Sequence, residues 1–178
     1  MTRPMIKFIA ERLNFVKLCD NNGLFGAEIG VWKGENAENI LKNLPINTLY
    51  LIDPYTPYID GDKRNIEVVD PSPHYKTALN RLEPYIKDTT IIFKLEKSVD
   101  AAKTMPPNIL DFVYIDGDHT YENVSQELEA FYPLVESGGV LGGHDINFYG
   151  VMKAVGEFAE KHRLHPMTDK QDWWIVKP

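Results

Sequence analysis

Short apolar runs bounded by turn residues alternate along this chain with amphipathic stretches of helical period, the pattern of strands and crossover helices. Strands are predicted at residues 26–30, 48–53, 89–95, 110–116, 140–143 and 172–177. Helices are predicted at residues 5–18, 35–44, 75–85, 99–105, 121–136 and 151–162, the fifth ended by the glycines of Ser137-Gly138-Gly139. The alternation indicates a doubly wound α/β fold with a mostly parallel sheet.

One segment interrupts this alternation. Residues 54–74 are rich in Pro, Tyr and Asp, and we expect a loop there with at most short helical pieces. A loop of this length is unusual in a compact domain and predicts a lid or a substrate-binding insert. Residues 1–178 are expected to form a single domain, which includes an N-terminal helix within residues 1–20 and this loop.

Composition narrows the range of partners. The net charge of −7, with no basic stripe, argues against nucleic acid, which is bound by clustered Lys and Arg. No apolar stretch approaches transmembrane length, and the N-terminus lacks the features of a signal peptide, so we expect no membrane partner. Cys19 is the single cysteine, and we expect it to be a buried packing residue and not a nucleophile. These features predict a cytoplasmic protein that acts on a small molecule, and they leave a homo-oligomer open.

The first strand leads into a glycine loop that is the first chemically informative motif. Gly30 allows a tight turn, and Gly34 allows a ligand to approach the next helix, with Val31 and Trp32 between them. The loop lacks the third glycine of a dinucleotide motif, and Glu28 would repel a pyrophosphate. A carboxylate at Glu28 instead suits the ammonium of a methionyl group, directly or through water.

Further polar residues follow the next strands. Asp53 ends the second strand where an acid accepts hydrogen bonds from ribose hydroxyls, and Ser98 follows the third where a polar group contacts adenine. Asp116 ends the fourth strand. With Glu28, these residues predict a rim suited to a cationic sulfur nucleoside, although Asp53 also fits a strand-end cap.

Four segments carry a family resemblance: AEIGVWKGENAENIL, YLIDPY, DFVYIDGDHTYENV and VESGGVLGGHDI. They resemble class I S-adenosylmethionine-dependent methyltransferases, and most closely the small O-methyltransferases of the macrocin type, which act on antibiotic sugars. The resemblance runs from about residue 25 to residue 146. It implies S-adenosylmethionine as cofactor and a seven-stranded sheet whose C-terminal strand is antiparallel.

A second polar cluster is expected beside the first. If the fourth and fifth strands are neighbours, Asp116, His144 and Asp145 project into one crevice and could hold a divalent cation, Mg²⁺ or Mn²⁺. Metal-dependent relatives place acidic or amide residues after the fifth strand, so His144 departs from their pattern. This leaves metal-free catalysis open, with His144 acting on protons.

Two residues are candidates for the catalytic base. In related sugar methyltransferases, the base resembles either an Asp two residues beyond the metal-binding acid or a His three beyond it, and this chain has both, Asp118 and His119. His119 ranks first because an imidazole pKa near ~6.5 suits neutral pH. Each residue also has a structural interpretation. Asp118 could cap the helix that follows, and His119 could donate a hydrogen bond to a backbone carbonyl.

Aromatic residues in the predicted loops are candidates to line an acceptor pocket or to cover the apolar core: Tyr55, Tyr58, Tyr75, Phe148 and Tyr149.

Taken together, the motifs and the resemblance predict methyl transfer from S-adenosylmethionine to a hydroxyl of a small molecule, such as a sugar or a phenol. A catalytically inactive cofactor-binding partner subunit is the alternative from another class. A nicotinamide-dependent oxidoreductase is a third reading, opposed by the glycine spacing and by Glu28.

Overall fold

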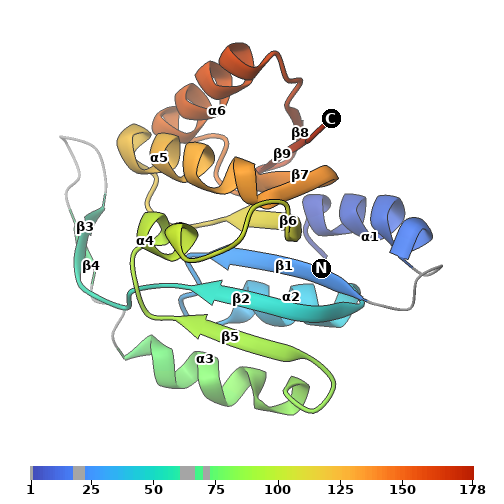
Figure 1. The fold of residues 1–178 in the computed structure, drawn as a ribbon. Helices are drawn as coiled ribbons and strands as arrows, with labels where there is room; N and C mark the ends of the chain where they lie inside the picture. The colour runs from blue at the N-terminus through green and yellow to red at the C-terminus, as the bar shows by residue number, and fades with distance from the viewer. Residues whose placement is uncertain (1, 18–22, 61–66, 70–72) are drawn as a thin grey trace.

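A mostly parallel sheet with helices on both faces forms the molecule (Figure 1). The computed structural model describes residues 2–17, 23–60, 67–69 and 73–178. Within these ranges the main sheet has seven strands, in the spatial order β5 (Thr90–Lys94), β2 (Ile46–Ile52), β1 (Leu24–Ile29), β6 (Leu110–Ile115), β7 (Val135–Gly143), β9 (Asp172–Val176) and β8 (Met167–Asp169). The first five are parallel, and β9 is antiparallel to both neighbours. The predicted doubly wound α/β fold with an antiparallel C-terminal strand is confirmed.

The direction of the chain across the sheet reverses at β1. From β1 the chain moves outward to β2 and β5, then returns to β6 on the other side of β1 and continues to β7. Connections that leave two neighbouring strands in opposite directions open a crevice at the carboxyl ends of those strands, where such sheets bind ligands. The residues that follow Ile29, Ile52 and Ile115 are therefore placed to form a site.

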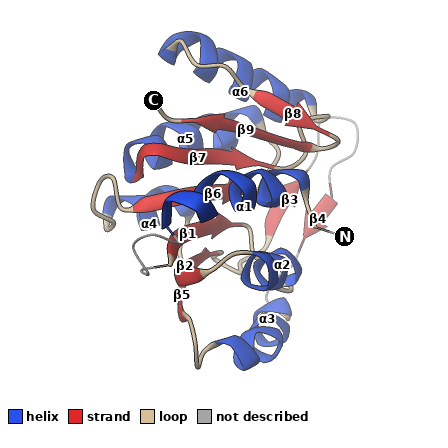
Figure 2. Cartoon of the chain, turned by 90° about the vertical axis from the view of Figure 1, so that its right-hand side faces the viewer, coloured by secondary structure: helices blue, strands red, loops and turns tan. Residues whose placement is uncertain are grey.

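Six α-helices of the described chain cover the sheet: α1 (Pro4–Lys17), α2 (Glu35–Asn43), α3 (His74–Leu82), α4 (Ser98–Lys103), α5 (Tyr121–Phe131) and α6 (Tyr149–His162). Strand side chains alternate between two apolar layers. Phe112 and Tyr114 of β6 pack in the layer of α1, α2 and α3, and Figure 2 shows α1 lying across this face. Val113 and Ile115 pack in the layer of α4, α5 and α6. No helix of the described part combines the length and the apolar character needed to cross a bilayer.

The predicted end of the fifth helix is wrong. Helix α5 stops at Phe131, a short 3₁₀ turn covers Tyr132–Leu134, and β7 already begins at Val135. Pro133 explains the early stop, because proline lacks the N–H that would continue the helical hydrogen bonds. The glycines Gly138 and Gly139 therefore lie inside strand β7 and do not cap a helix.

The prediction for residues 54–74 is corrected in part. Short strands β3 (Tyr58–Asp60) and β4 (Glu67–Val69) pair there antiparallel, in place of the expected short helical pieces. The β-branched residues of β4 favour an extended chain over a helix. The lid role of the segment stays a prediction, and residues 61–66 and 70–72 lie outside the described ranges, as does Cys19.

Candidate active site

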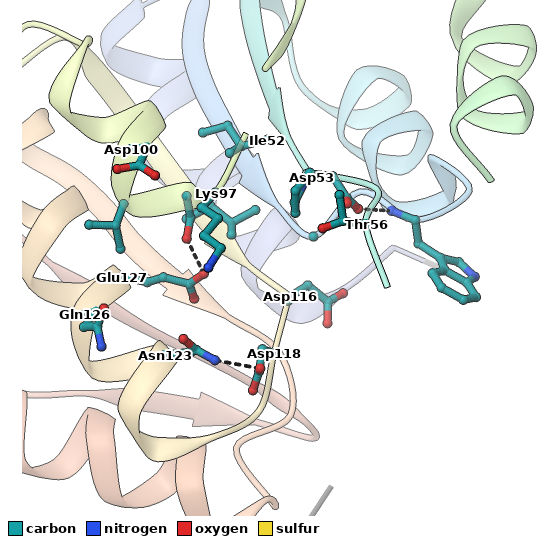
Figure 3. Close-up of a pocket in the computed structure, with 17 residues that line it drawn as sticks. Ile52, Asp53, Thr56, Lys97, Asp100, Asp116, Asp118, Asn123, Gln126 and Glu127 are labelled. Carbon is teal, nitrogen blue, oxygen red and sulfur yellow. Dashed lines mark hydrogen bonds between the residues drawn. The ribbon is translucent and has the colours of Figure 1, made fainter. Parts of the chain in front are cut away.

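A cavity of about 440 Å³ opens at the carboxyl ends of β1, β2 and β6, where the chain reverses direction (Figure 3). Five of the predicted cofactor-binding residues line it: Gly30, Trp32, Asp53, Ser98 and Asp116. Its volume is typical of cofactor and small-molecule pockets. The structure thus brings together residues from four separate parts of the chain, as the sequence predicts.

Gly30 is the point where the loop after β1 touches the loop after β6. Its φ of 81° favours glycine, and a Cβ atom there would lie 2.2 Å from the carbonyl oxygen of Asp116. The N–H of Asp116 donates to the carbonyl of Ile29 at 2.8 Å, which keeps the two loops in contact. Glycine is therefore required at this position for packing as well as for the turn.

Asp53 ties the loop after β2 to the glycine loop. Its Oδ2 accepts the backbone N–H groups of Val31 and Trp32, both at 3.0 Å, and its Oδ1 accepts the N–H of Tyr55 at 2.8 Å. The Tyr55 hydroxyl donates to the carbonyl of Trp32 at 2.9 Å. Trp32 and Tyr55 have φ angles of 51° and 47°, a region that bulky side chains rarely adopt, so these bonds hold the cavity wall in an unusual shape. Ribose binding by Asp53 stays a prediction.

Three residues predicted to bind the cofactor lie behind the cavity wall. Glu28 is fully buried, and its Oε1 accepts a hydrogen bond from Asn36 at 2.9 Å. Side chains alternate along β1, so Ile29 faces the cavity and Glu28 faces the opposite layer. Val31 is buried in that same layer, and a Cβ atom on Gly34 would meet Ala78 of α3 at 3.3 Å. These three residues support the loop from behind in the described structure, and their contact with a cofactor stays a prediction.

The buried carboxyl of Glu28 has a shifted pKa. Burial raises the pKa from 4.5 to about 8, and the hydrogen bond from Asn36 offsets only part of that rise. The desolvated charged form is disfavoured, so Glu28 holds its proton at neutral pH in the ligand-free protein.

Helix α5 supplies a wall of the cavity that was not predicted from the sequence. In Figure 3, Asn123, Gln126 and Glu127 extend from this helix into the cavity. Glu127 is 5% exposed, and its Oε1 accepts a 2.7 Å hydrogen bond from Ser98. Burial raises the pKa of Glu127 to about 7, against the lowering effect of Ser98. The available signal was a glutamate on the apolar face of an amphipathic helix, beside Leu128.

The loops after β6 and β7 meet as predicted and form a cluster of acids and imidazoles. His119 Nε2 lies 2.9 Å from Asp145 Oδ2, and His144 Nδ1 lies 3.1 Å from Asp145 Oδ1 and 3.7 Å from Asp116 Oδ1. Burial alone would raise the pKa of Asp145, but the hydrogen bonds of both histidines lower it well below its usual value. Asp145 therefore stays charged and orients the two rings.

This cluster has the composition of a divalent cation site. One ligand atom each from Asp116, His144 and Asp145 lies within 4.8 Å of the others, and two carboxylates with one imidazole suit Mg²⁺ or Mn²⁺. The donor set therefore fits the predicted metal.

Asp118 and His119 have different surroundings. Both oxygens of Asp118 accept hydrogen bonds, from the Thr120 N–H at 2.7 Å and from Asn123 Nδ2 at 2.6 Å. Asp118 thus closes the turn before α5, and the helix cap is Thr120. His119 is held by Asp145 and stacks on Phe148 with ring centroids 4.6 Å apart. An imidazole oriented by a carboxylate has the surroundings of a general base, and the identity of the catalytic base stays a prediction.

The aromatic residues separate into two groups. Phe148 and Tyr149, at the start of α6 beside His119, are 46% and 72% exposed, so they are available to an acceptor. Tyr55 is buried, and Tyr75 packs between Tyr55 and Phe93. Tyr55 and Tyr75 therefore cover the apolar core. The side chain of Tyr58 lies outside the described part.

Comparison with known proteins agrees with this geometry. Residues 27–146 match the family described as "methyltransferase domain". An uncharacterised protein of Acanthamoeba polyphaga mimivirus is 27% identical over 138 residues, which make up 76% of this chain. The chain spans 58% of the length of that relative.

Solved structures share the fold at low identity. The O-methyltransferase NovP is 19% identical with a TM-score of 0.68, over 97% of this chain and 79% of that one. A putative caffeoyl-CoA O-methyltransferase from Staphylococcus aureus is 14% identical with a TM-score of 0.63, over 100% and 85% of the chains. An rRNA methylase from Streptococcus thermophilus is 12% identical with a TM-score of 0.61, over 98% and 95%, so the fold alone does not choose the acceptor. The family match over most of the chain, together with the cavity at the strand reversal, shows that this chain belongs to the class I S-adenosylmethionine-dependent methyltransferases.

Proposed function

We propose that this chain transfers the methyl group of S-adenosylmethionine to a hydroxyl of a small molecule, such as a sugar or a phenol. The observation that carries the proposal is the position of Asp116, which lines the 440 Å³ cavity and also belongs to the cluster of His119, His144 and Asp145. A cofactor in the cavity would lie next to groups that hold and accept protons.

Methyl transfer requires few catalytic groups from the protein. Methyl transfer from a sulfonium needs an oxygen nucleophile in line with the methyl group and a base that takes its proton. His119 is the proposed base, because Asp145 holds its ring at 2.9 Å and stabilises the protonated form. The exposed ring of Phe148, stacked on His119, offers an apolar face to the acceptor.

A divalent cation, Mg²⁺ or Mn²⁺, would be held by Asp116, His144 and Asp145. When bound, it would lower the pKa of the acceptor hydroxyl and orient it. The surrounding residues act with or without the ion: Asp145 orients both imidazoles, and His119 receives the proton.

The charge of the chain favours a small acceptor over RNA. A net charge of −7 opposes contact with a phosphate backbone, and the acids around the cluster would add to the repulsion. The rRNA methylase of similar fold is therefore a weaker guide to the acceptor than the O-methyltransferases.

Two measurements on one protein sample test the proposal. Calorimetric titration with S-adenosylhomocysteine should show binding, and its absence would contradict cofactor use. Labelled S-adenosylmethionine is then offered with sugars and phenols, with Mg²⁺ or with EDTA. Binding without transfer to any acceptor would favour the inactive partner-subunit reading. Equal transfer with Mg²⁺ and with EDTA would remove the metal from the mechanism.

A further inference from the structure

Arg3, immediately before α1, reaches the carboxyl end of β6. Its Nη1 lies 3.1 Å from Asp116 Oδ2 and donates a 2.9 Å hydrogen bond to the hydroxyl of Tyr114. The guanidinium carbon also lies 5.5 Å from the centre of the Tyr114 ring. The side chains of Arg3 and Asp116 are 30% and 17% exposed, so this is a half-buried ion pair.

The position of Arg3 is fixed by its neighbours. The N–H of Met5, in the first turn of α1, donates to Asp172 Oδ2 at 2.9 Å, and the Tyr114 hydroxyl donates to Asp172 Oδ1 at 2.9 Å. Asp172 is 1% exposed and belongs to β9. One buried carboxylate thus holds both the start of α1 and the tyrosine that receives the guanidinium.

The two oxygens of Asp116 face two different cationic or protonatable groups. Oδ2 faces Arg3, and Oδ1 faces His144 Nδ1 at 3.7 Å. A divalent ion on Asp116, His144 and Asp145 would need an Asp116 oxygen at bonding distance, with the guanidinium on the same carboxylate. Two like charges at such a separation repel strongly where water is partly excluded.

We propose that Arg3 is the resident counter-ion of Asp116 and competes with a divalent cation for that carboxylate. The cation binds the cluster of Asp116, His144 and Asp145 more weakly while Arg3 stays on the carboxylate. This inference concerns the cation site of the proposed function, but its test needs neither cofactor nor acceptor.

The test compares Mn²⁺ binding to wild-type protein and to Arg3→Gln, using the electron paramagnetic resonance signal of free Mn²⁺. We expect Arg3→Gln to bind about tenfold more tightly or better, because a neighbouring positive charge is gone. Arg3→Lys keeps the charge and should stay close to wild type. Lys7→Gln, a neutralisation at an exposed position of α1, should leave the affinity unchanged.

Two further measurements make the result specific. Adding Asp116→Asn to Arg3→Gln should abolish the gain, because it removes the shared carboxylate. Circular dichroism and the melting temperature report whether α1 remains docked. If Arg3→Gln unfolds, Arg3→Met takes its place as the neutral variant: tighter Mn²⁺ binding than Lys7→Gln supports the competition, and equal affinity contradicts it. Equal affinities of folded wild type and Arg3→Gln, or no Mn²⁺ binding by either, would overturn the inference. Titration of the same samples with S-adenosylhomocysteine tests the proposed function separately.

Discussion

The carboxylate of Asp53 holds the backbone of Trp32, whose N–H it accepts at 3.0 Å. The same oxygen accepts the N–H of Val31, so a residue expected to bind a ligand also shapes the loop that surrounds the ligand. Buried backbone donors left without an acceptor destabilise their surroundings. We therefore expect cofactor binding in this cavity to depend on Asp53 whether or not Asp53 touches the ribose.

Replacing Asp53 by Ala should weaken S-adenosylhomocysteine binding by about 100-fold, because three backbone N–H groups lose their acceptor and the loop loosens. Isothermal titration measures the affinity. Asp88→Ala, at an exposed position, is the matched control and should bind as wild type does. An unchanged affinity of Asp53→Ala would remove Asp53 from the site.

Two glycine-to-alanine changes should act in opposite directions on stability. Gly30→Ala places a methyl group 2.2 Å from the Asp116 carbonyl oxygen and should lower the free energy of unfolding by roughly 3–5 kcal/mol. Gly156→Ala, inside α6 with no neighbour within 4 Å, should raise it by about 0.5–1 kcal/mol. Urea unfolding measures both. A tolerated Gly30→Ala would show that the two loops can move apart.

Glu28 should make the protein less stable as the pH rises. Its pKa is about 8 in the folded chain against 4.5 for the free group, so between these values the folded state keeps a proton that the unfolded state releases. The free energy of unfolding should therefore fall by up to about 1.4 kcal/mol per pH unit from pH 5 to pH 8. The pKa of about 7 for Glu127 acts in the same direction.

Urea unfolding at several pH values tests this contribution of Glu28. Glu28→Gln keeps the shape of the side chain without a titrating proton, so its stability should depend less on pH than that of wild type. Glu35→Gln changes an exposed glutamate and should keep the wild-type slope. Parallel slopes for Glu28→Gln and wild type would contradict the raised pKa.

His119→Ala should lower turnover by about 10²–10⁴-fold, the usual effect of removing a general base, while the affinity for S-adenosylhomocysteine stays near wild type. The reason is that His119 contacts Asp145 and Phe148 and does not line the cofactor cavity. Steady-state kinetics with the identified acceptor gives the rate, and His165→Ala at an exposed position is the control. Full turnover by His119→Ala would assign the base elsewhere.

The sequence predicted the order of the elements well because buried parallel strands appear as continuous apolar runs. It missed β8 (Met167–Asp169), a short edge strand whose residues are all exposed and carry no apolar pattern. It extended α5 past Pro133 because the apolar spacing continues through Leu134 into β7. For β8, pairing with β9 decided the structure where the local pattern was silent, whereas Pro133 was a local signal for the end of α5 that the apolar spacing obscured.

The candidate site was predicted less completely than the fold. The convergence of Asp116, His144 and Asp145 followed from the adjacency of two strands. Glu28 does not line the cavity, because side chains alternate along β1 and that of Ile29 takes the cavity side. Arg3 carried no signal, since its contact with Asp116 depends on how α1 docks against β9.

The hydrogen bond between Met5 and Asp172 joins the first helix to the last strand. During synthesis the ribosome releases α1 long before Asp172 exists, and domains complete their contacts only when the partner segments have emerged. The position of Arg3 beside Asp116 is therefore fixed only after Asp172 has been synthesised. A nascent chain in which β9 has not yet been made lacks the carboxylate that holds both the start of α1 and Tyr114.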